Sequence, residues 1–509
     1  MNDLVLTGTV LTVDADRRVI DRGAVYVHDG LIEAVQDASA PPPAGFERAT
    51  RVNTRGLITP GLIDLHNHLA YNTLPLWSGR DTTYATRYQW PAAPTYQSDV
   101  SNPAQALGIA APAAALRFAE VKAIVGGVTA IQGSPPMTRA FPGWMVRNVE
   151  KESIGVKQPI FQSVLVATPA QLDKTAERLR QNRSFFYHLG EGVDPKLRSE
   201  YQLLRSHDCV GAGLIGIHST ALTSADFADW ATVGAGSIVW SPFSNLWLYG
   251  GTSDVLTARA AGIKVCLGSD WTPSGTRNVL GELKIAATWN AASLGGALSN
   301  EDLVEMATAN PGDTLARPWG VQVGRLVPGA LADIAVFARS VADDPWRNVL
   351  EADERHVQFV MVGGRPAYGN RSLLAAAGVT DIESITVAGI RRGIVMELPD
   401  ELLPDAPDLQ RQANKSWADG LAELAAVWAD PKAAVERARR QRAVGVDPFE
   451  FVPEFPPVGA DARALDDDEL EQLVMPTFDG ISHDAAWRRA VSRRALDHAP
   501  VLIDAMKRF

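Results

Sequence analysis

Short apolar segments alternate with Ala-rich, helix-forming segments from about residue 61 to about residue 318. The apolar segments have the length of buried strands, and the segments between them are long enough for helices. Strands that alternate with helices in this way pack side by side as a parallel sheet. About 250 residues of such alternation is the usual length of a (β/α)8 barrel. We therefore predict an α/β fold in which residues 59–318 form a (β/α)8 TIM-like barrel.

The number of candidate strands is one short of the eight that such a barrel needs. Only one of them lies between residues 134 and 184, where the alternation requires two. We expect a further strand within 143–150, which reads GWMVRNVE. The other candidates are the segments 61–65, 127–133, 160–168, 184–190, 212–219, 236–242 and 263–270.

Strand-rich sequence lies on both sides of the predicted barrel. Residues 3–58 contain short alternating segments separated by turn signals such as Asp29-Gly30. The same texture returns in 323–338 and 356–368. We predict a small β-sandwich domain that is built from both ends of this region, residues 1–58 and 319–370.

Residues 371–509 differ from the rest of the chain. Good helix formers at helical periodicity fill 408–444, and a Pro-rich stretch at 447–459 interrupts them. Trp417 and Trp428 lie on one apolar helical face that needs a partner. We predict a mostly helical C-terminal extension that packs on the barrel or across a contact in a homodimer or higher homo-oligomer.

The role of this extension is open from sequence. It either braces the fold, which we favour, or closes a substrate pocket. We expect it to hold no metal ligand, and we expect its two histidines, His483 and His498, to be structural or exposed.

Composition and charge exclude several classes of protein. A hydrophobic content of 46% with 21% charged residues is typical of a soluble globular protein. A net charge of −11 without a basic stripe argues against a nucleic-acid partner. The first residues do not resemble a signal peptide, and no apolar run is long enough to span a membrane. The two cysteines, Cys209 and Cys266, form no CxxC pair, which argues against a disulfide framework or a thiolate zinc site, so we expect a cytoplasmic protein.

Five polar side chains stand at the C-terminal ends of four predicted barrel strands. In a barrel of this type these ends converge on one mouth, where catalytic groups lie. Two of the five are separated by a single residue, so both point to the same side of an extended strand. Imidazole nitrogens and carboxylate oxygens are suitable ligands for a divalent cation. The five residues are His66, His68, His188, His218 and Asp270.

The segments that carry these residues resemble a known family. The motifs are PGLIDLHNH, HLGEG, GIHSTALT, SPFSNLWL, LGSDWTPSG and VGRLVPGALADIAVF. Their order and spacing resemble the amidohydrolase superfamily and, within it, the branch of cytosine deaminase, guanine deaminase and the chlorotriazine hydrolases. The resemblance extends from about residue 3 to about residue 370. It implies a barrel with a small β-sandwich, as the strand pattern also predicts.

The resemblance also implies a metal site with one divalent ion per chain, with zinc placed first and iron second. The implied ligands are His66, His68, His188 and Asp270. Glu191 and His218 would lie beside the metal-bound water. The strand at 160–168 lacks the lysine that would bridge two ions, although Lys157 lies just before it. Ala221 occupies a position where relatives often have a second histidine.

The expected chemistry follows from this ligand set. Three imidazoles and one carboxylate leave the ion with a net positive charge and an open position, so its bound water would have a pKa lowered toward ~7. Asp270 would accept the proton of that water, and Glu191 would move it to the departing nitrogen. His218 would stabilise the tetrahedral intermediate electrostatically. The expected catalytic residues are therefore Glu191, His218 and Asp270.

A long segment after His68, residues 69–99, is rich in aromatic side chains. Loops at a barrel mouth build pockets, so we expect an aromatic wall over a flat substrate, with a self-packed surface loop as the alternative. The expected wall residues are Tyr71, Trp77, Trp90, Phe243, Trp247 and Trp271. Candidates for a clamp on a substrate carboxylate are Arg80, Arg87 and Arg277.

The function that these features favour is hydrolysis of a non-peptide C–N bond in a small cyclic or aromatic substrate. Deamination of an aminated heterocycle comes first, and hydrolysis of a cyclic or aryl amide is the close alternative, because both use the same groups. Dehalogenation of an aryl halide by the same hydroxide is a third possibility. A non-catalytic assembly module is the alternative from another class, but such a protein is expected to have lost ligands, and this chain has the full set.

Overall fold

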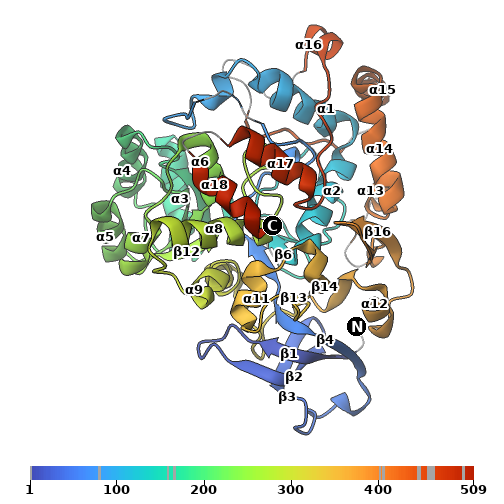
Figure 1. Ribbon diagram of the computed structural model, residues 1–509. Coiled ribbons are helices and arrows are strands. Elements are labelled where there is room, and N and C mark those ends of the chain that lie inside the picture. The colour runs from blue at the N-terminus through green and yellow to red at the C-terminus, as the bar shows by residue number, and fades with distance from the viewer. Residues whose placement is uncertain are drawn as a thin grey trace.

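The computed structural model describes residues 3–509 apart from residue 78 and the segments 80–81, 157–159, 164–167, 401–402, 404–406, 444–448, 456–464 and 496–498. Figure 1 shows the N-terminal strands at the bottom of the molecule, helices around central strands above them, and C-terminal helices along one side and across the front. None of the helices in the described parts of the chain is long and apolar enough to cross a membrane.

Parallel strands form two arcs at the centre of the molecule, with strand orders β5-β6-β7 and β12-β11-β10-β9-β8. The arcs meet where the Leu65 N–H donates to the Leu267 carbonyl at 3.2 Å. β7 lies inside 143–150, where we expected the additional strand. With the helices between them, these strands form an α/β fold of TIM-barrel type. Their bounds are β5 (Leu62–Asp64), β6 (Val128–Ile131), β7 (Arg147–Asn148), β8 (Ile160–Ser163), β9 (Ser184–Leu189), β10 (Leu214–His218), β11 (Ser237–Trp240) and β12 (Lys264–Leu267).

Apolar side chains from these strands form one buried cluster. Ile63, Phe186, Ile215, Val239 and Cys266 are in contact within it, and each is at most 1% exposed. A strand buried on both faces tolerates few polar side chains along its length. The polar residues therefore occur where the strands end, and parallel strands end on the same side.

Helices cover the outside of the strands, and several begin with a side-chain cap. The Thr168 and Gln171 side chains form a reciprocal capping box at the start of α3. The Asn278 side chain accepts the Gly281 N–H at the start of α8. The helices of this region are α1 (Asn102–Ala110), α2 (Pro112–Val125), α3 (Pro169–Arg180), α4 (Arg198–Ser206), α5 (Ser224–Thr232), α6 (Pro242–Tyr249), α7 (Val255–Ala260), α8 (Val279–Ser293), α9 (Asn300–Glu305) and α10 (Ala309–Trp319).

A nine-stranded mixed sheet combines strands from both sides of the barrel, in the order β16-β17-β15-β14-β13-β4-β1-β2-β3. The N-terminal and later strands meet where β4 and β13 pair antiparallel, with Ile58 opposite Val336. We expected a small β-sandwich here. The strands instead pair in one continuous hydrogen-bond ladder and so form a single sheet. The bounds are β1 (Leu4–Leu11), β2 (Val19–His28), β3 (Leu31–Asp37), β4 (Thr50–Pro60), β13 (Ile334–Phe337), β14 (Val357–Val362), β15 (Arg365–Gly369), β16 (Glu383–Val387) and β17 (Ile390–Ile394). α11 (Pro345–Glu351) and α12 (Arg371–Ala376) accompany the later strands.

After the short helix α12, the C-terminal extension continues as strand rather than helix. β16 and β17 form a hairpin that joins the edge of the sheet beside β15. We expected the extension to be mostly helical because its strongest periodicity lies further along. The two short strands alternate only over five residues each, and they are stabilised by a sheet edge that the sequence does not show.

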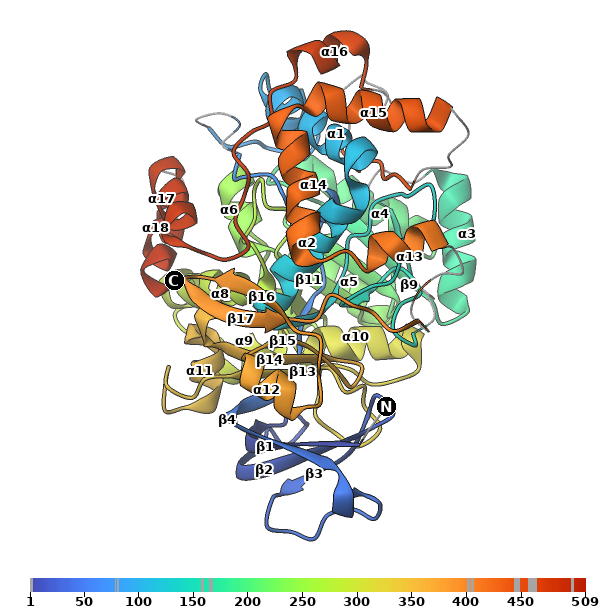
Figure 2. The same cartoon turned by 90° about the vertical axis from the view of Figure 1, so that its right-hand side faces the viewer.

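The remaining extension packs as helices on the barrel. α14 contacts α2, α15 contacts α1, and α18 contacts α8. Figure 2 shows α14 and α15 running beside α1 and α2, with α17 and α18 on another side. Trp417, from the predicted apolar face, stacks on Phe118 with ring centroids 5.9 Å apart. These helices are α13 (Pro407–Ala413), α14 (Trp417–Ala429), α15 (Pro431–Ala443), α16 (Asp467–Gln472), α17 (Ala485–Arg494) and α18 (Pro500–Ala505).

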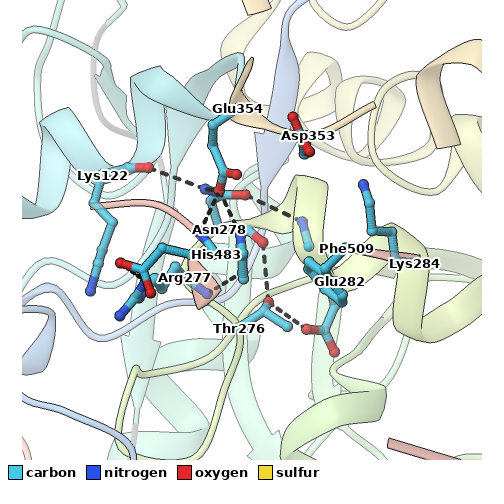
Figure 3. Close-up of polar contacts among 12 residues, drawn as sticks. Lys122, Thr276, Arg277, Asn278, Glu282, Lys284, Asp353, Glu354, His483 and Phe509 are labelled. Atoms are coloured by element: carbon cyan, nitrogen blue, oxygen red, sulfur yellow. Dashed lines mark hydrogen bonds and ion pairs between the residues drawn. The ribbon is translucent and has the colours of Figure 1, made fainter. Parts of the chain in front are cut away.

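A buried cluster of charged side chains, which we call the polar joint, fastens the extension to the barrel (Figure 3). The Lys122 ammonium donates to Asp479 at 2.6 Å, and Arg277 makes two hydrogen bonds to the same carboxylate. The His483 ring lies between the Arg277 N–H and the Glu354 carboxylate, at 2.8 and 2.6 Å. The joint consists of Lys122, Arg277, Asn278, Glu354, Asp479 and His483.

Candidate metal centre

Four histidines and one aspartate come together at the C-terminal ends of the parallel strands. His66 and His68 follow β5, and His188 and His218 lie near the ends of β9 and β10. The His66 ring centroid is 4.8 Å from that of His68, 4.9 Å from that of His188 and 5.1 Å from that of His218. Asp270 follows β12, and its Oδ1 is 3.3 Å from His66 Nε2 and 3.7 Å from His68 Nε2. All five side chains are buried.

Several buried polar atoms in this cluster make no hydrogen bond within the described part of the chain. They are His66 Nε2, both ring nitrogens of His188 and Glu191 Oε2. Buried polar atoms in native proteins are nearly always satisfied, so a group of unsatisfied ones indicates a missing ligand. Potential ligand atoms lie within 4.8 Å of one another in the sets His66–His68–Asp270 and His66–His188–His218. The donor set of imidazole nitrogen and carboxylate oxygen fits a divalent cation such as zinc.

The charge balance of the cluster also favours a cation. Burial would raise the pKa of Asp270, but His66 and the other imidazoles around it lower that pKa below its ordinary range. Burial lowers the pKa of His66, but Asp270, Gln132 and Glu191 together raise it, so the net shift is upward. Burial and the neighbouring imidazoles lower the pKa of His188 well below its ordinary value. An ionised carboxylate thus faces at least one neutral imidazole, and positive charge between them would be stabilised.

The backbone is strained at two of the converging positions. His218 and Asp270 have φ values of 62° and 59°, and Ser219 has 53°. Residues other than glycine rarely adopt this left-handed region, and such strain clusters at functional sites.

The hydrogen bonds around His218 determine which of its nitrogens carries the proton. Trp240 Nε1 donates to Thr252 Oγ1, and the Thr252 hydroxyl donates to Asn245 Oδ1 at 3.1 Å. The Asn245 amide nitrogen is therefore the group that faces His218 Nδ1, at 3.0 Å. Because an amide N–H only donates, His218 Nδ1 accepts and Nε2 carries the proton. Burial lowers the pKa of His218 to about 3, so the ring is a neutral donor at neutral pH, with Nε2 3.8 Å from Glu191.

Glu191 is held at the turn that leaves β9. Its Oε1 accepts the Tyr249 hydroxyl at 2.5 Å, and its other carboxylate oxygen makes no hydrogen bond with any residue that the structure describes. Burial raises the pKa of Glu191 above its ordinary value, against the opposing effect of the Arg87 guanidinium. A buried carboxyl with a raised pKa takes up a proton more readily than an ordinary carboxylate, which suits it to proton exchange.

Two of the arginines that we considered as substrate clamps are occupied in the structure. Arg87 Nη1 donates to the His188 carbonyl at 2.8 Å and lies 3.4 Å from Glu200, so it holds the β9 turn. Arg277 is bound to Asp479 in the polar joint. Arg80 and Lys157 lie outside the described residues.

The aromatic residues predicted to line a pocket divide into two groups. The Trp271 ring contacts those of Tyr71 and Trp90, and the Tyr71 ring lies 6.5 Å from that of His68 and 4.9 Å from that of Trp271. Trp77, Phe243 and Trp247 form a second group away from the histidine rings: Trp247 Nε1 donates to the Trp77 carbonyl, and the Phe243 ring stacks on that of Trp247.

The sequence analysis missed three side chains that touch the cluster. Gln132 Oε1 lies 3.0 Å from His66 Nδ1, and Asn245 faces His218 as described above. Gln132 lies at the end of the predicted strand 127–133, and Asn245 lies in SPFSNLWL. A polar side chain at each of these positions was the only signal that the sequence offered for these contacts. The third, Glu454, belongs to the extension and lies 3.3 Å from His68 Nδ1. Nothing in its local sequence indicates this contact.

The remaining histidines of interest lie elsewhere. His207 Nδ1 is 2.9 Å from Asp173 at the end of α4, and His483 belongs to the polar joint. His498 lies outside the described residues.

Comparison with known proteins gives related sequences and folds. Residues 198–367 match the family model described as the amidohydrolase family. The chain is 27% identical over 420 residues to a 5-methylthioadenosine/S-adenosylhomocysteine deaminase from Syntrophobacter fumaroxidans, which covers 73% of this chain and 94% of the relative. Two solved structures have similar folds at 18% identity. Atrazine chlorohydrolase from Arthrobacter aurescens TC1, complexed with zinc, has a TM-score of 0.56 over 72% of this chain and 95% of its own. Guanine deaminase from C. acetobutylicum, with bound guanine, has a TM-score of 0.57 over 72% of this chain and 100% of its own.

Proposed function

We propose a hydrolytic deaminase function for this chain, which fits the amidohydrolase superfamily and, within it, the branch of deaminases and chlorotriazine hydrolases. The matches confirm the resemblance drawn from the sequence motifs. The proposal is a metal-dependent hydrolase of the C–N bond in an aminated heterocycle. We further propose that the two parallel arcs close into the expected (β/α)8 barrel. As expected from the sequence, the proposed protein is cytoplasmic and forms a homo-oligomer.

The observation that carries this proposal is the group of unsatisfied nitrogens and oxygens at the strand ends. His66, His68, His188 and Asp270 would hold one divalent ion, zinc first and iron second. When bound, such an ion acts as a Lewis acid that lowers the pKa of water and so supplies hydroxide at neutral pH. The structural neighbour complexed with zinc supports the choice of metal.

The side chains around the ion would divide the proton transfers. Asp270, with its lowered pKa, is ionised and can accept a proton from water in the site. Glu191 can hold that proton on its free oxygen, because its pKa is raised, and deliver it to the departing nitrogen. His218 Nε2 lies 3.8 Å from Glu191 and 3.9 Å from Asp270, so its N–H would be placed to donate to the oxygen that becomes negative during attack.

The proposed substrate class is an aminated purine or a purine nucleoside. Relatives and neighbours that are named as deaminases act on adenosine-derived compounds or hold guanine. In this chain Tyr71, Trp90 and Trp271 offer aromatic faces beside the histidines, on which a flat heterocycle can stack.

Ammonia release tests the proposal. Zinc-loaded protein would be incubated with adenosine, 5′-deoxyadenosine, methylthioadenosine, guanine, hydantoins, aryl amides and chlorinated triazines, while ammonia, ring opening and chloride are followed in parallel. We expect ammonia from at least one aminated purine, and release that is about 10²–10⁴-fold slower from Glu191→Gln. Ring opening or chloride without ammonia would replace deamination by one of the alternatives. A folded protein that binds no divalent metal would end the hydrolase proposal.

A further inference from the structure

A segment of the C-terminal extension, residues 449–455, returns to the mouth of the parallel strands. We call this segment the strap. Its backbone is bound along its length: the Glu450 N–H donates to Thr138 Oγ1 at 2.9 Å, and the Phe451 N–H donates to the Gly108 carbonyl at 3.2 Å. A Cβ atom at Gly108 would lie 2.4 Å from the Phe451 carbonyl oxygen, so the glycine permits this approach. The strap is therefore fastened to the barrel before it reaches the metal centre.

Two tyrosines of the aromatic segment hold the end of the strap. The Phe455 N–H donates to the Tyr71 hydroxyl oxygen at 2.9 Å, and the Tyr96 hydroxyl donates to the Phe455 carbonyl at 2.7 Å. The Phe455 ring lies 4.7 Å from the His68 ring and 5.1 Å from that of Trp90. Both backbone groups of residue 455 are thus satisfied, and the preceding side chain has a defined place beside His68.

That preceding side chain, Glu454, points at a candidate metal ligand. Its Oε1 lies 3.3 Å from His68 Nδ1, its side chain is 3% exposed, and its Oε2 makes no hydrogen bond with any described residue. A carboxylate only accepts, so this contact places the proton of neutral His68 on Nδ1. His68 Nε2, which lies 3.7 Å from Asp270, is then free of a proton and able to bind a cation.

The same arrangement occurs at the neighbouring ligand. His66 Nδ1 faces the carbonyl oxygen of the Gln132 amide at 3.0 Å, and Gln132 donates to Glu150 at 2.8 Å, which orients the amide. His66 Nε2 then faces the centre, and it has no hydrogen-bond partner in the described part of the chain. An acceptor on the far nitrogen orients a metal-binding imidazole and makes its other nitrogen more basic. The barrel supplies this acceptor for His66, and the extension supplies it for His68.

We propose that Glu454 is a positioning residue of the metal centre, which the C-terminal extension supplies to hold His68 in the orientation and tautomer that bind the metal. This inference rests on the proposed metal-dependent function. It changes the role we expected for the extension, because the strap completes the centre in addition to bracing the fold. It also assigns Tyr71 and Tyr96 to holding the strap.

Zinc affinity of the purified full-length protein, measured by competition with a chromophoric chelator, tests this role without an activity assay. Glu454→Leu keeps the volume but removes the acceptor, and we expect zinc binding to weaken by about 10–100-fold. Glu454→Gln should recover much of the affinity, because an amide oxygen serves His66 in the same way. The matched control is Glu450→Gln, in the same strap, whose side chain binds Arg442 outside the centre and whose change should leave zinc affinity as it is.

The melting temperature of the metal-free variants separates positioning from packing. Weaker zinc binding by Glu454→Leu, with a metal-free melting temperature equal to wild type, supports the proposal. Unchanged zinc affinity overturns it. So does a loss that comes with lower metal-free stability and is equal for Glu454→Leu, Glu454→Gln and Phe455→Leu, because then the strap only packs. Wild-type protein that binds no zinc would instead mean that the proposed function has failed.

Discussion

The metal centre and the polar joint are both buried clusters of charged and polar side chains, but their atoms are satisfied in different ways. In the joint Lys122 and Arg277 form ion pairs with Asp479, and the His483 ring accepts the Arg277 N–H on Nε2 and donates from Nδ1 to Glu354. In the centre His188 has no hydrogen-bond partner on either ring nitrogen among the described residues. Burial of polar groups is therefore not what distinguishes a site from a structural cluster here. The distinction is whether the protein itself satisfies them.

The two clusters should respond to mutation in opposite ways. Removing one partner from a buried ion pair leaves an uncompensated charge and costs about 3–5 kcal/mol. Removing a side chain whose polar atoms would be satisfied by a bound ligand lowers mainly the stability of the ligand-bound protein.

Loss of the metal should have the largest effect on turnover. Chelation, or His188→Ala, should abolish ammonia release, because the centre then lacks its Lewis acid or one of its ligands. Zinc at 1,000 times its dissociation constant should stabilise the wild type by about 4 kcal/mol, and this gain should be absent in His188→Ala. Calorimetry with and without zinc measures this stabilisation in the wild type and in His188→Ala. An equal zinc-induced rise in the variant would show that His188 is not a ligand.

Glu191→Gln should lower kcat by about 10²–10⁴-fold, because the amide cannot carry a proton from water to the leaving nitrogen. Zinc content and melting temperature should stay at wild-type values, since the Tyr249 hydroxyl can still donate to the amide oxygen. Steady-state kinetics on the identified substrate, with elemental analysis of the same sample, provide the test. Wild-type kcat would remove Glu191 from the mechanism.

Asp479→Ala should lower the free energy of unfolding by about 3–5 kcal/mol, because Lys122 and Arg277 would remain buried without their shared counter-charge. Zinc affinity should not change. Urea denaturation of the metal-free protein measures the loss. Glu471→Gln, which breaks the surface pair with Lys432, is the control and should cost under about 1 kcal/mol.

Acid should weaken the polar joint through Glu354. Burial works to raise the pKa of this carboxyl, but His483 and a hydrogen bond from Asn278 hold it at about 2, below its ordinary value of 4.5. Between these values the unfolded chain binds the proton and the folded chain does not, so stability is present above pH 4.5 and is lost as the pH falls toward 2. The contribution is roughly 3 kcal/mol. The stability difference between wild type and Glu354→Gln should therefore shrink between pH 5 and pH 2.5 in urea titrations, and a constant difference would contradict it.

His207→Ala should have the smallest effect. This histidine contacts Asp173 at the protein surface and belongs to neither cluster. Zinc content and turnover should match those of the wild type. The free energy of unfolding of the metal-free variant should match the wild-type value within about 0.5 kcal/mol. A loss of zinc would mean that the centre extends beyond the strand ends.

Local sequence patterns specify which side chains can meet at the strand ends. Apolar runs of strand length that end in His66, His188, His218 or Asp270 specify both the element and the position of the polar residue, because parallel strands end at a common edge. Glu191 follows from its place three residues beyond His188. These are local patterns, and the structure brings the residues together as that geometry requires.

The groups that hold these side chains in place are specified by tertiary packing and cannot be identified from local sequence. Asn245 and Gln132 are ordinary polar residues until the neighbouring strands bring them to His218 and His66. Glu454 lies 386 positions from His68, in a Pro-rich stretch without periodicity, and its contact depends on how the extension wraps the barrel. The same reason explains why the β16–β17 hairpin was missed, since β17 pairs with β15 at the edge of a sheet built from distant segments. Local sequence encodes periodicity and strand ends, whereas contacts between distant segments arise from packing that no single segment contains.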